Sequence, residues 1–113
     1  MTCLFCKIAT GALKADIVYE SDEVLAFRDI NPQAPTHILI IPKQHISTLN
    51  ETQADHKLLL GTMVFTAKEI AKTEGLSDSG YRLIFNVNQD GGQTVYHIHL
   101  HVIGGRPMTW PPG

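Results

Sequence analysis

The chain has 113 residues, of which 43% are hydrophobic, and its formal net charge is −2 at pH 7. This length predicts one domain over residues 1–113 with a modest hydrophobic core. The weak negative charge argues against a nucleic-acid partner, and no apolar run reaches the roughly 18 residues that a membrane span needs. Because the N-terminus also lacks a signal-peptide pattern, we expect a cytoplasmic protein whose two cysteines stay reduced.

The first half of the chain is predicted to form a short helix followed by three strands. Apolar spacing, a glycine stop and turn signals place these elements at 4–9, 17–19, 24–27 and 37–41. The first two strands would form a hairpin. The proline-rich segment 29–35 is expected to be a stiff irregular loop, and Pro42 would end the third strand.

The second half is predicted to contain one long helix and two more strands. The helix would begin at Thr52, where 52–55 resembles a capping box, and stop at Gly75. Its apolar stripe is interpreted as core: Leu60, Met63, Val64, Ala67, Ile70 and Ala71. The strands would cover 81–87 and 97–103. Strands grouped around one long helix favour an α+β fold with an antiparallel sheet.

Histidine and aliphatic residues alternate without interruption over 97–103. In a strand, His97, His99 and His101 would share one face with roughly 6.6 Å between successive positions, because a strand rises about 3.3 Å per residue. Imidazoles at that spacing suit a phosphate substrate. Three solvated histidines, or a three-histidine zinc hydrolase, are the alternatives.

Segment 90–94, Asp-Gly-Gly-Gln-Thr, lies just before the histidines and offers backbone and side-chain donors to an anion. The same letters also form ordinary hairpin turns. A neutral imidazole can attack phosphorus directly, and His99 suits that role because a histidine flanks it on each side. His101 would then stabilise charge on the phosphoryl oxygens or protonate the leaving group, and the residues alone do not decide between these roles.

The alternating stretch 97–103 resembles the histidine triad motif. Segments 27–37, 91–96 and 110–113 are also similar to the nucleotide-binding branch of the histidine triad (HIT) superfamily, so the resemblance covers essentially the whole chain. It implies the HIT fold, which is a five-stranded antiparallel sheet with one long and one short helix. It also implies a C-terminal tail over 104–113.

The resemblance further implies a purine nucleoside phosphoramidase, which hydrolyses the P–N bond of adenosine or guanosine 5′-phosphoramidates and releases AMP or GMP. His99 would carry a covalent nucleotidyl group, His37 and His101 would complete the catalytic set, and the chemical step would need no metal. Asp29 would bind the ribose hydroxyls. The nucleotide-binding residues implied by matching positions are Leu4, Phe5, Phe27, Asp29, Ile30, Leu39, Asn86, Gly92, Gln93, Thr94, His99 and His101.

Two cysteines near the N-terminus distinguish this chain from many close relatives in the family. The C-x-x-C spacing of Cys3 and Cys6 can turn both thiols to one side of a helix start, which is a common half of a zinc site. Some members of the superfamily are similar in adding an upstream histidine and the first triad histidine, here His45 and His97. We therefore expect a structural zinc on these four residues, with a pair of free thiols as the alternative.

Two other functions remain open at this point. One is a diadenosine polyphosphate hydrolase, and the other is a nucleotide-binding protein whose hydrolysis is vestigial. The Gly-Gly-Gln-Thr and Trp-Pro-Pro-Gly segments favour the phosphoramidase branch. Family members are similar in forming homodimers whose tail often reaches the partner's active site, so we expect a homodimer. Trp110 should then be packed, since an exposed indole is costly.

Overall fold

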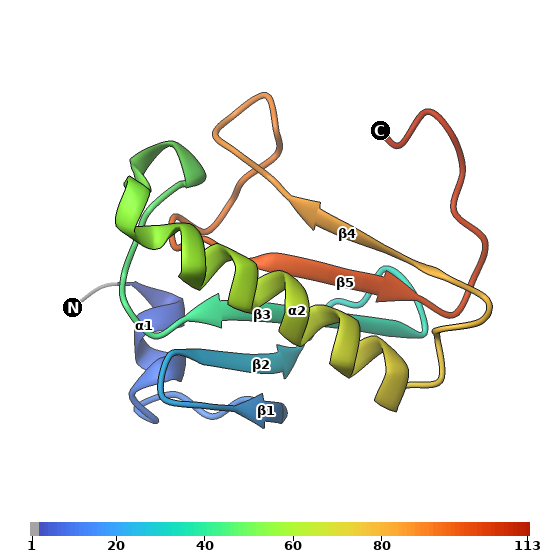
Figure 1. Ribbon diagram of the computed structural model, residues 1–113, viewed down its shortest axis with the longest axis horizontal. Coiled ribbons are helices and arrows are strands. Elements are labelled where there is room, and N and C mark those ends of the chain that lie inside the picture. Colours follow the sequence, from blue (N-terminus) through green and yellow to red (C-terminus); the bar gives the residue numbers. More distant parts are fainter. Residues whose placement is uncertain (1–2) are drawn as a thin grey trace.

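The computed structural model describes residues 3–113 and contains five strands, which form one antiparallel sheet in the order β1-β2-β3-β5-β4 (Figure 1). The strands are β1 (Ile17–Glu20), β2 (Val24–Arg28), β3 (Thr36–Pro42), β4 (Tyr81–Phe85) and β5 (Leu100–Gly104). The helices are α1 (Leu4–Ala9) and α2 (Lys57–Thr73), with 3₁₀ turns at η1 (Leu49–Glu51) and η2 (Ala54–His56). The predicted α+β class and five-stranded antiparallel sheet are confirmed.

The central strand β3 reads Thr-His-Ile-Leu-Ile-Ile-Pro, and every one of its residues is buried. β-branched residues of this kind suit a pleated surface covered on both faces, and the proline stands at the strand end. β3 pairs with β2 on one side and β5 on the other, with His37 opposite Ile103 and Leu39 opposite His101. The register therefore puts two histidines from distant segments on neighbouring positions of one face.

Helix α2 crosses one face of the sheet and forms the main core with it (Figure 1). Met63, Ala67 and Ile70 are buried against strand residues that include Ile38, Ile40 and Val102. Within the predicted stripe Leu60 is only partly buried, and the assignment of Val64 to the core was wrong. Val64 lies about 100° around the helix from Met63, at the edge of the stripe, and its side chain is 44% exposed.

The long helix begins at Lys57 rather than at the predicted Thr52. Two 3₁₀ turns precede it, and the Thr52 hydroxyl donates to the Leu49 carbonyl (2.7 Å), so it closes the first of these turns. The backbone N–H of Gln53 donates to Nδ1 of His56 (2.9 Å) just before the helix. The capping box expected at 52–55 is therefore replaced by a histidine that accepts from the residue three positions earlier.

The histidine strand is shorter than the alternation predicted. β5 begins at Leu100, so the segment 97–99 lies outside the ladder, and the Ile98 N–H donates to the Ile46 carbonyl (2.8 Å) instead of to a strand neighbour. The alternation of faces nevertheless holds, because Ile98, Leu100 and Val102 pack in the α2 core. Strand β4 likewise ends at Phe85, two residues before the predicted end.

Helix α1 contributes to a second, smaller core cluster. Phe5 and Ile8 are buried with Phe27, Leu39 and Ile41 of β2 and β3. Cys3 caps the helix, since its Sγ accepts from the Cys6 backbone N–H at 3.4 Å. The short helix is thus confirmed at the predicted residues, and it lies beside the sheet end where β3 finishes (Figure 1).

The tail beyond Gly104 contains no helix or strand among the described residues. It lies beside the edge strand, where Arg82 of β4 donates to the Thr109 carbonyl (2.9 Å). Trp110 is 83% exposed in the single chain, so its packing stays a prediction about the dimer. A tail that follows a sheet edge leaves its indole with no face to cover. None of the helices within residues 3–113 has the length and apolar character that a membrane crossing requires.

Candidate active site

A cavity of about 400 Å³ opens between α1, the end of β2 and the residues that lead into β5. Most of its wall is apolar, and Asp29, His99 and His101 supply its ionisable groups together with two basic residues. The lining comprises Leu4, Phe5, Ile8, Leu13, Lys14, Ala15, Phe27, Arg28, Asp29, Ile30, Leu39, Thr94, Val95, His99 and His101. An apolar cavity with a few convergent polar groups is the usual form of a small-molecule site.

The structure brings most of the expected nucleotide-binding residues to this cavity. Ile30 is fully exposed and therefore stands at its rim. Asn86, Gly92 and Gln93 lie outside the lining. No motif in the sequence pointed to the contribution of segment 13–15.

Gln93 is a buried residue of the connection between β4 and β5, and its hydrogen bonds hold that connection in shape. Its Oε1 accepts from the Asn88 N–H (3.0 Å), and its Nε2 donates to the carbonyls of Ser47 (2.8 Å) and Val95 (3.1 Å). Both N–H donors of the Gln93 amide are thereby used. The loop presents Thr94 to the cavity, while Gln93 supports the loop from behind.

His99 carries a lone pair on a ring that lines the cavity. Its Nδ1 is 2.8 Å from the carbonyl oxygen of His97, and because a carbonyl only accepts, Nδ1 must hold the proton. Nε2 is then unprotonated. Burial lowers the pKa of His99, so the neutral form prevails at pH 7. The edge of Phe5 packs on the ring, with centroids 5.0 Å apart.

His37 and His101 form a chain whose tautomers follow from one backbone donor. The Gln33 N–H donates to Nδ1 of His37 (3.0 Å), which places the His37 proton on Nε2. That Nε2 lies 2.9 Å from Nδ1 of His101 and donates to it. His101 must therefore carry its own proton on Nε2.

The Nε2–H of His101 is buried and has no acceptor among the described residues. A buried donor without a partner is costly unless a ligand satisfies it. Burial, followed by the nearby His99 and His37, lowers the pKa of His101 to about 4, so the ring is neutral at pH 7. The site thus offers one free lone pair on His99 and one free N–H on His101.

Asp29 lies beside the hydrogen-bonded pair of His37 and His101. One carboxylate oxygen accepts from the Asn31 N–H (2.8 Å), and the other lies 3.5 Å from Nε2 of His37. Burial lowers the pKa of His37, although the Asp29 charge opposes that shift. The carboxylate is therefore held at the mouth of the cavity by the loop that follows β2.

Four ligand atoms converge at the start of α1. The thiols of Cys3 and Cys6 and the Nδ1 atoms of His45 and His97 all lie within 4.8 Å of one another, and we call these four residues the metal cluster. The separations are 3.4 Å from Cys3 to His97, 3.3 Å from Cys6 to His45, 3.5 Å from Cys6 to His97 and 3.2 Å between the two histidines. A tetrahedron with zinc–ligand distances of about 2.0 to 2.3 Å has edges of about 3.3 to 3.8 Å.

The protonation of His97 also fits a cation. Its Nε2 lies 2.8 Å from the Pro42 carbonyl and must donate to it, and burial lowers the pKa of the ring. Nδ1 is therefore a lone pair that faces two thiols and the Nδ1 of His45. One lone pair accepts one hydrogen bond, whereas a metal ion would satisfy all four ligand atoms together.

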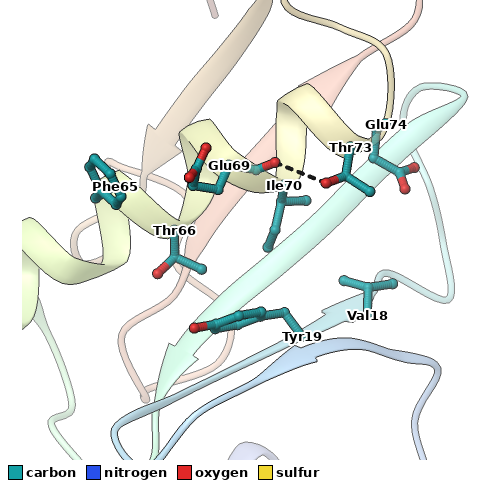
Figure 2. Close-up of a pocket in the computed structure, with 8 residues that line it drawn as sticks. All are labelled: Val18, Tyr19, Phe65, Thr66, Glu69, Ile70, Thr73 and Glu74. Carbon is teal, nitrogen blue, oxygen red and sulfur yellow. Dashed lines mark hydrogen bonds between the residues drawn. The ribbon is translucent and has the colours of Figure 1, made fainter.

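A second hollow of about 400 Å³ lies between α2 and β1 (Figure 2). Its lining consists of Val18, Tyr19, Phe65, Thr66, Glu69, Ile70, Thr73 and Glu74. The Thr73 hydroxyl donates to the Glu69 carbonyl (3.2 Å), and the Glu74 carboxylate makes two 3.0 Å bonds to Arg28. This hollow has neither histidine nor cysteine in its lining, so the chemistry belongs to the other cavity.

Three backbone groups determine the protonation of the site, namely the Gln33 N–H and the carbonyls of Pro42 and His97. Sequence reasoning missed all three. Every residue supplies such groups, so no side-chain pattern identifies the ones that a fold will use.

Comparisons with known proteins agree with this geometry. The HIT domain family model matches residues 10–108. The purine nucleoside phosphoramidase of Escherichia coli K12 is 55% identical over 93% of this chain and 88% of its own length. An uncharacterised HIT-like protein of Synechococcus elongatus is 56% identical over 97% of this chain and 96% of its own.

Solved structures show the same relation. A HIT family hydrolase from Legionella pneumophila superposes with a TM-score of 0.98 at 62% identity, covering 99% of this chain and 100% of the other. A Zn-bound histidine triad family protein from Mycobacterium smegmatis superposes with a TM-score of 0.83 at 35% identity, covering 94% of this chain and 76% of the other. The fold, the triad and the relatives agree, and the chain belongs to the HIT domain family.

Proposed function

We propose that this protein is a purine nucleoside phosphoramidase that hydrolyses adenosine or guanosine 5′-phosphoramidates to the nucleoside monophosphate. The observation that carries the proposal is the complementary pair of neutral imidazoles in one cavity, with a lone pair on His99 and an unsatisfied N–H on His101. A phosphoryl group needs these two things, a nucleophile for phosphorus and a donor for oxygen. The E. coli relative named above supports the same reaction.

The cavity accommodates the substrate in a defined way under this proposal. The purine would lie among the apolar side chains of Phe5, Phe27 and Leu39, and Ile30 would cover it from the rim. Asp29 would accept from the ribose hydroxyls, because its carboxylate is fixed at the same wall. The hydroxyl of Thr94 would bind the phosphate beside the histidines.

The reaction has two balanced steps. Nε2 of His99 attacks phosphorus, a P–N bond to the enzyme forms, and the P–N bond to the amine breaks, which leaves a nucleotidyl-histidine. Water then attacks phosphorus, the His99–phosphorus bond breaks, and the nucleoside monophosphate leaves with the oxygen of water, while the proton that this water loses returns to the solvent and replaces the one taken by the amine. The Nδ1–H of His99 stays bound to the His97 carbonyl throughout and keeps Nε2 as the reacting atom.

The tautomers favour charge stabilisation as the role of His101. If the neutral ring gave up its Nε2 proton, it would need another at Nδ1 from His37, and His37 cannot recover one from a backbone amide. His101 therefore donates a hydrogen bond to a phosphoryl oxygen. The departing amine takes its proton from water.

The test is single-turnover hydrolysis of adenosine 5′-phosphoramidate by purified protein. Mass spectrometry after a rapid quench should find a nucleotidyl group on His99, and His99→Ala should lose several powers of ten in turnover while still binding AMP. A diadenosine polyphosphate is measured in parallel. Faster turnover of that substrate would transfer the assignment to the polyphosphate hydrolases, and AMP binding without turnover of either would leave a nucleotide-binding protein.

We also propose that the metal cluster binds a structural zinc. Two thiolates and two imidazoles are a closed tetrahedral set of the kind zinc prefers, and the measured ligand separations suit it. Burial and the neighbouring Cys3 raise the pKa of the Cys6 thiol in the metal-free protein, and a bound ion would displace that proton. Thiolate sites of this kind persist in a reducing compartment, so we place the protein in the cytoplasm.

Elemental analysis of protein purified without chelator tests the zinc directly. About one zinc per chain should be found, as a closed four-ligand site predicts, and the content should fall in Cys3→Ser and in His45→Ala. The melting temperature of stripped protein should rise when zinc is added back. Metal-free protein whose melting temperature does not change when zinc is added would contradict this assignment and leave the role of His99 untouched.

The protein is further proposed to act as a homodimer. The support is the exposed Trp110 at the end of a tail that the chain's own sheet does not cover. In a dimer the indole of one copy would reach the cavity of the other, as an extra wall for the leaving group.

A further inference from the structure

His97 connects the metal cluster to the proposed nucleophile, His99. The ring of His97 is fully buried, with Nδ1 facing the other three members of the cluster and Nε2 bound to the Pro42 carbonyl. The main-chain carbonyl of the same residue accepts the Nδ1–H of His99 at 2.8 Å. Any movement of His97 therefore moves the acceptor that determines the His99 tautomer.

The sheet does not fix this part of the backbone. Residues 97–99 precede β5, which begins at Leu100, whereas His101 lies inside the ladder opposite Leu39 and Ile84. The Ile98 N–H donates to Ile46, which lies beside the cluster residue His45. Apart from the packing of Ile98 in the α2 core, the segment that carries the nucleophile is therefore anchored by the metal cluster and its neighbour Ile46.

Phe5 supplies a second link between the cluster and the nucleophile. It lies between Cys3 and Cys6 in α1, and its ring packs edge-on against His97 and His99, with centroids 6.0 and 5.0 Å away. Ligands on both sides of Phe5 would fix its place on the His99 ring.

We propose that the metal cluster positions the nucleophile: Cys3, Cys6 and His45 hold His97, and His97 holds His99 with Nδ1 protonated and Nε2 free. The ion would take no part in the chemical step, and its effect would travel through the His97 carbonyl and the Phe5 ring. Metal occupancy should then raise kcat and change KM for the nucleotide much less, because none of the four cluster residues lines the cavity and Phe5 alone connects them to the purine wall. The kinetic part of this proposal rests on the proposed phosphoramidase function.

The experiment compares zinc-loaded protein, stripped protein, Cys6→Ser and a control, Ile70→Ala. Ile70 is buried in the α2 core, away from the cavity, so its loss lowers stability without touching the cluster. kcat and KM for adenosine 5′-phosphoramidate are measured well below each melting temperature. Long-range ¹H–¹⁵N NMR of the imidazoles reports the His99 tautomer independently of activity.

Stripping and Cys6→Ser should lower kcat by about 10- to 100-fold, the range seen when supporting partners of a functional group are removed. KM should change little, and the His99 signals should show a mixture of tautomers. Zinc should restore the stripped wild type but not Cys6→Ser. Ile70→Ala should keep both kcat and the single Nδ1–H tautomer despite its lower melting temperature.

Two results would overturn the proposal. One is an unchanged kcat and a single Nδ1–H tautomer of His99 in folded, stripped protein. The other is an equal loss of kcat in Ile70→Ala, which would assign the effect to general destabilisation. If Cys6→Ser does not fold, His45→Ala is judged by the same two criteria, since His45 is exposed and its loss is milder. A wild type that releases no AMP would refute the proposed function, while the NMR spectra would still decide the positioning role.

Discussion

The three imidazoles around the cavity differ in the proton that each one carries. His99 is protonated on Nδ1, whereas His37 and His101 are protonated on Nε2, and each assignment follows from a backbone partner or from a neighbour that has one. All three pKa values are lowered by burial. The site is therefore a set of neutral rings with fixed donor and acceptor directions.

Protonation of His101 gives the fold a defined dependence on pH. Its pKa is lowered from 6.5 to about 4 on folding, so between these values the unfolded chain binds more protons and stability is lost as the pH falls. The melting temperature should be nearly level above pH 6.5 in this respect and should drop toward pH 4. Calorimetry of the wild type beside His101→Gln, at equal zinc, isolates the effect. Parallel curves for the two proteins would contradict it.

At the level of the elements, the sheet separates two tasks. The α2 face holds the larger core, and the α1 side holds the cavity and the metal cluster. The connection between β4 and β5 joins the two, because it leaves an edge strand and returns with Thr94 and the histidines. Its shape depends on Gln93 and on close approach of its own backbone.

Gly91 is predicted to be essential to the shape of that connection. A Cβ at this position would lie 2.5 Å from the Val87 carbonyl oxygen and 2.7 Å from the Val87 nitrogen, both backbone atoms that cannot move aside cheaply. Gly91→Ala should lower both the melting temperature and kcat/KM, since the loop carries Thr94 into the cavity.

Gly61→Ala is the matched control. No atom lies within 4 Å of a Cβ at that position in α2, so alanine should stabilise the helix by about 0.5 to 1 kcal/mol and leave turnover unchanged. Thermal melts and steady-state kinetics of both variants give the comparison. Equal behaviour of the two alanine variants would show that the loop tolerates the clash.

The elements were predictable from sequence where side-chain pattern decides them. Alternation assigned the faces of His99 and Leu100 correctly, since period two fixes faces whether or not a ladder forms. The alternation did not predict where the strand starts, because the hydrogen bond from Ile98 to Ile46 depends on how distant segments pack together. The helix start was predicted wrongly for a similar reason, since the Thr52 hydroxyl donates to the Leu49 carbonyl of the preceding 3₁₀ turn and does not cap the helix.

The same distinction holds for the candidate site. Residue types and spacing pointed to Cys3 and Cys6 and to the histidines of the cavity, whereas His45 and His97 were added to the metal cluster by the family resemblance. The placement of Gln93 behind the loop was not predictable, because an amide bonds phosphate and backbone equally well. The exposed position of Trp110 depends on the path of the tail, and nothing in its own sequence determines that path.

For the whole molecule, the tail is the part whose removal should change function more than folding. Deleting 108–113 removes an indole that is 83% exposed and one carbonyl that accepts from Arg82, so the melting temperature should change little. Selectivity among phosphoramidates with small and bulky amines should change if the tail of one copy reaches the other. Light scattering at micromolar concentration should find a dimer. A monomer would contradict the proposed dimer, and unchanged selectivity would contradict the proposed role of the tail.

The separation of the core from the chemistry by a single sheet has an evolutionary consequence. Substitutions among Met63, Ala67 and Ile70 should act mainly on stability, so these positions can vary between lineages with different growth temperatures while the reaction persists. On the other side, one change in α1 touches the cavity wall and the metal cluster together. Sequence change in this family should therefore be gradual in the core beneath α2, where one substitution can compensate for another. Around α1 it should be abrupt and rarely reversed.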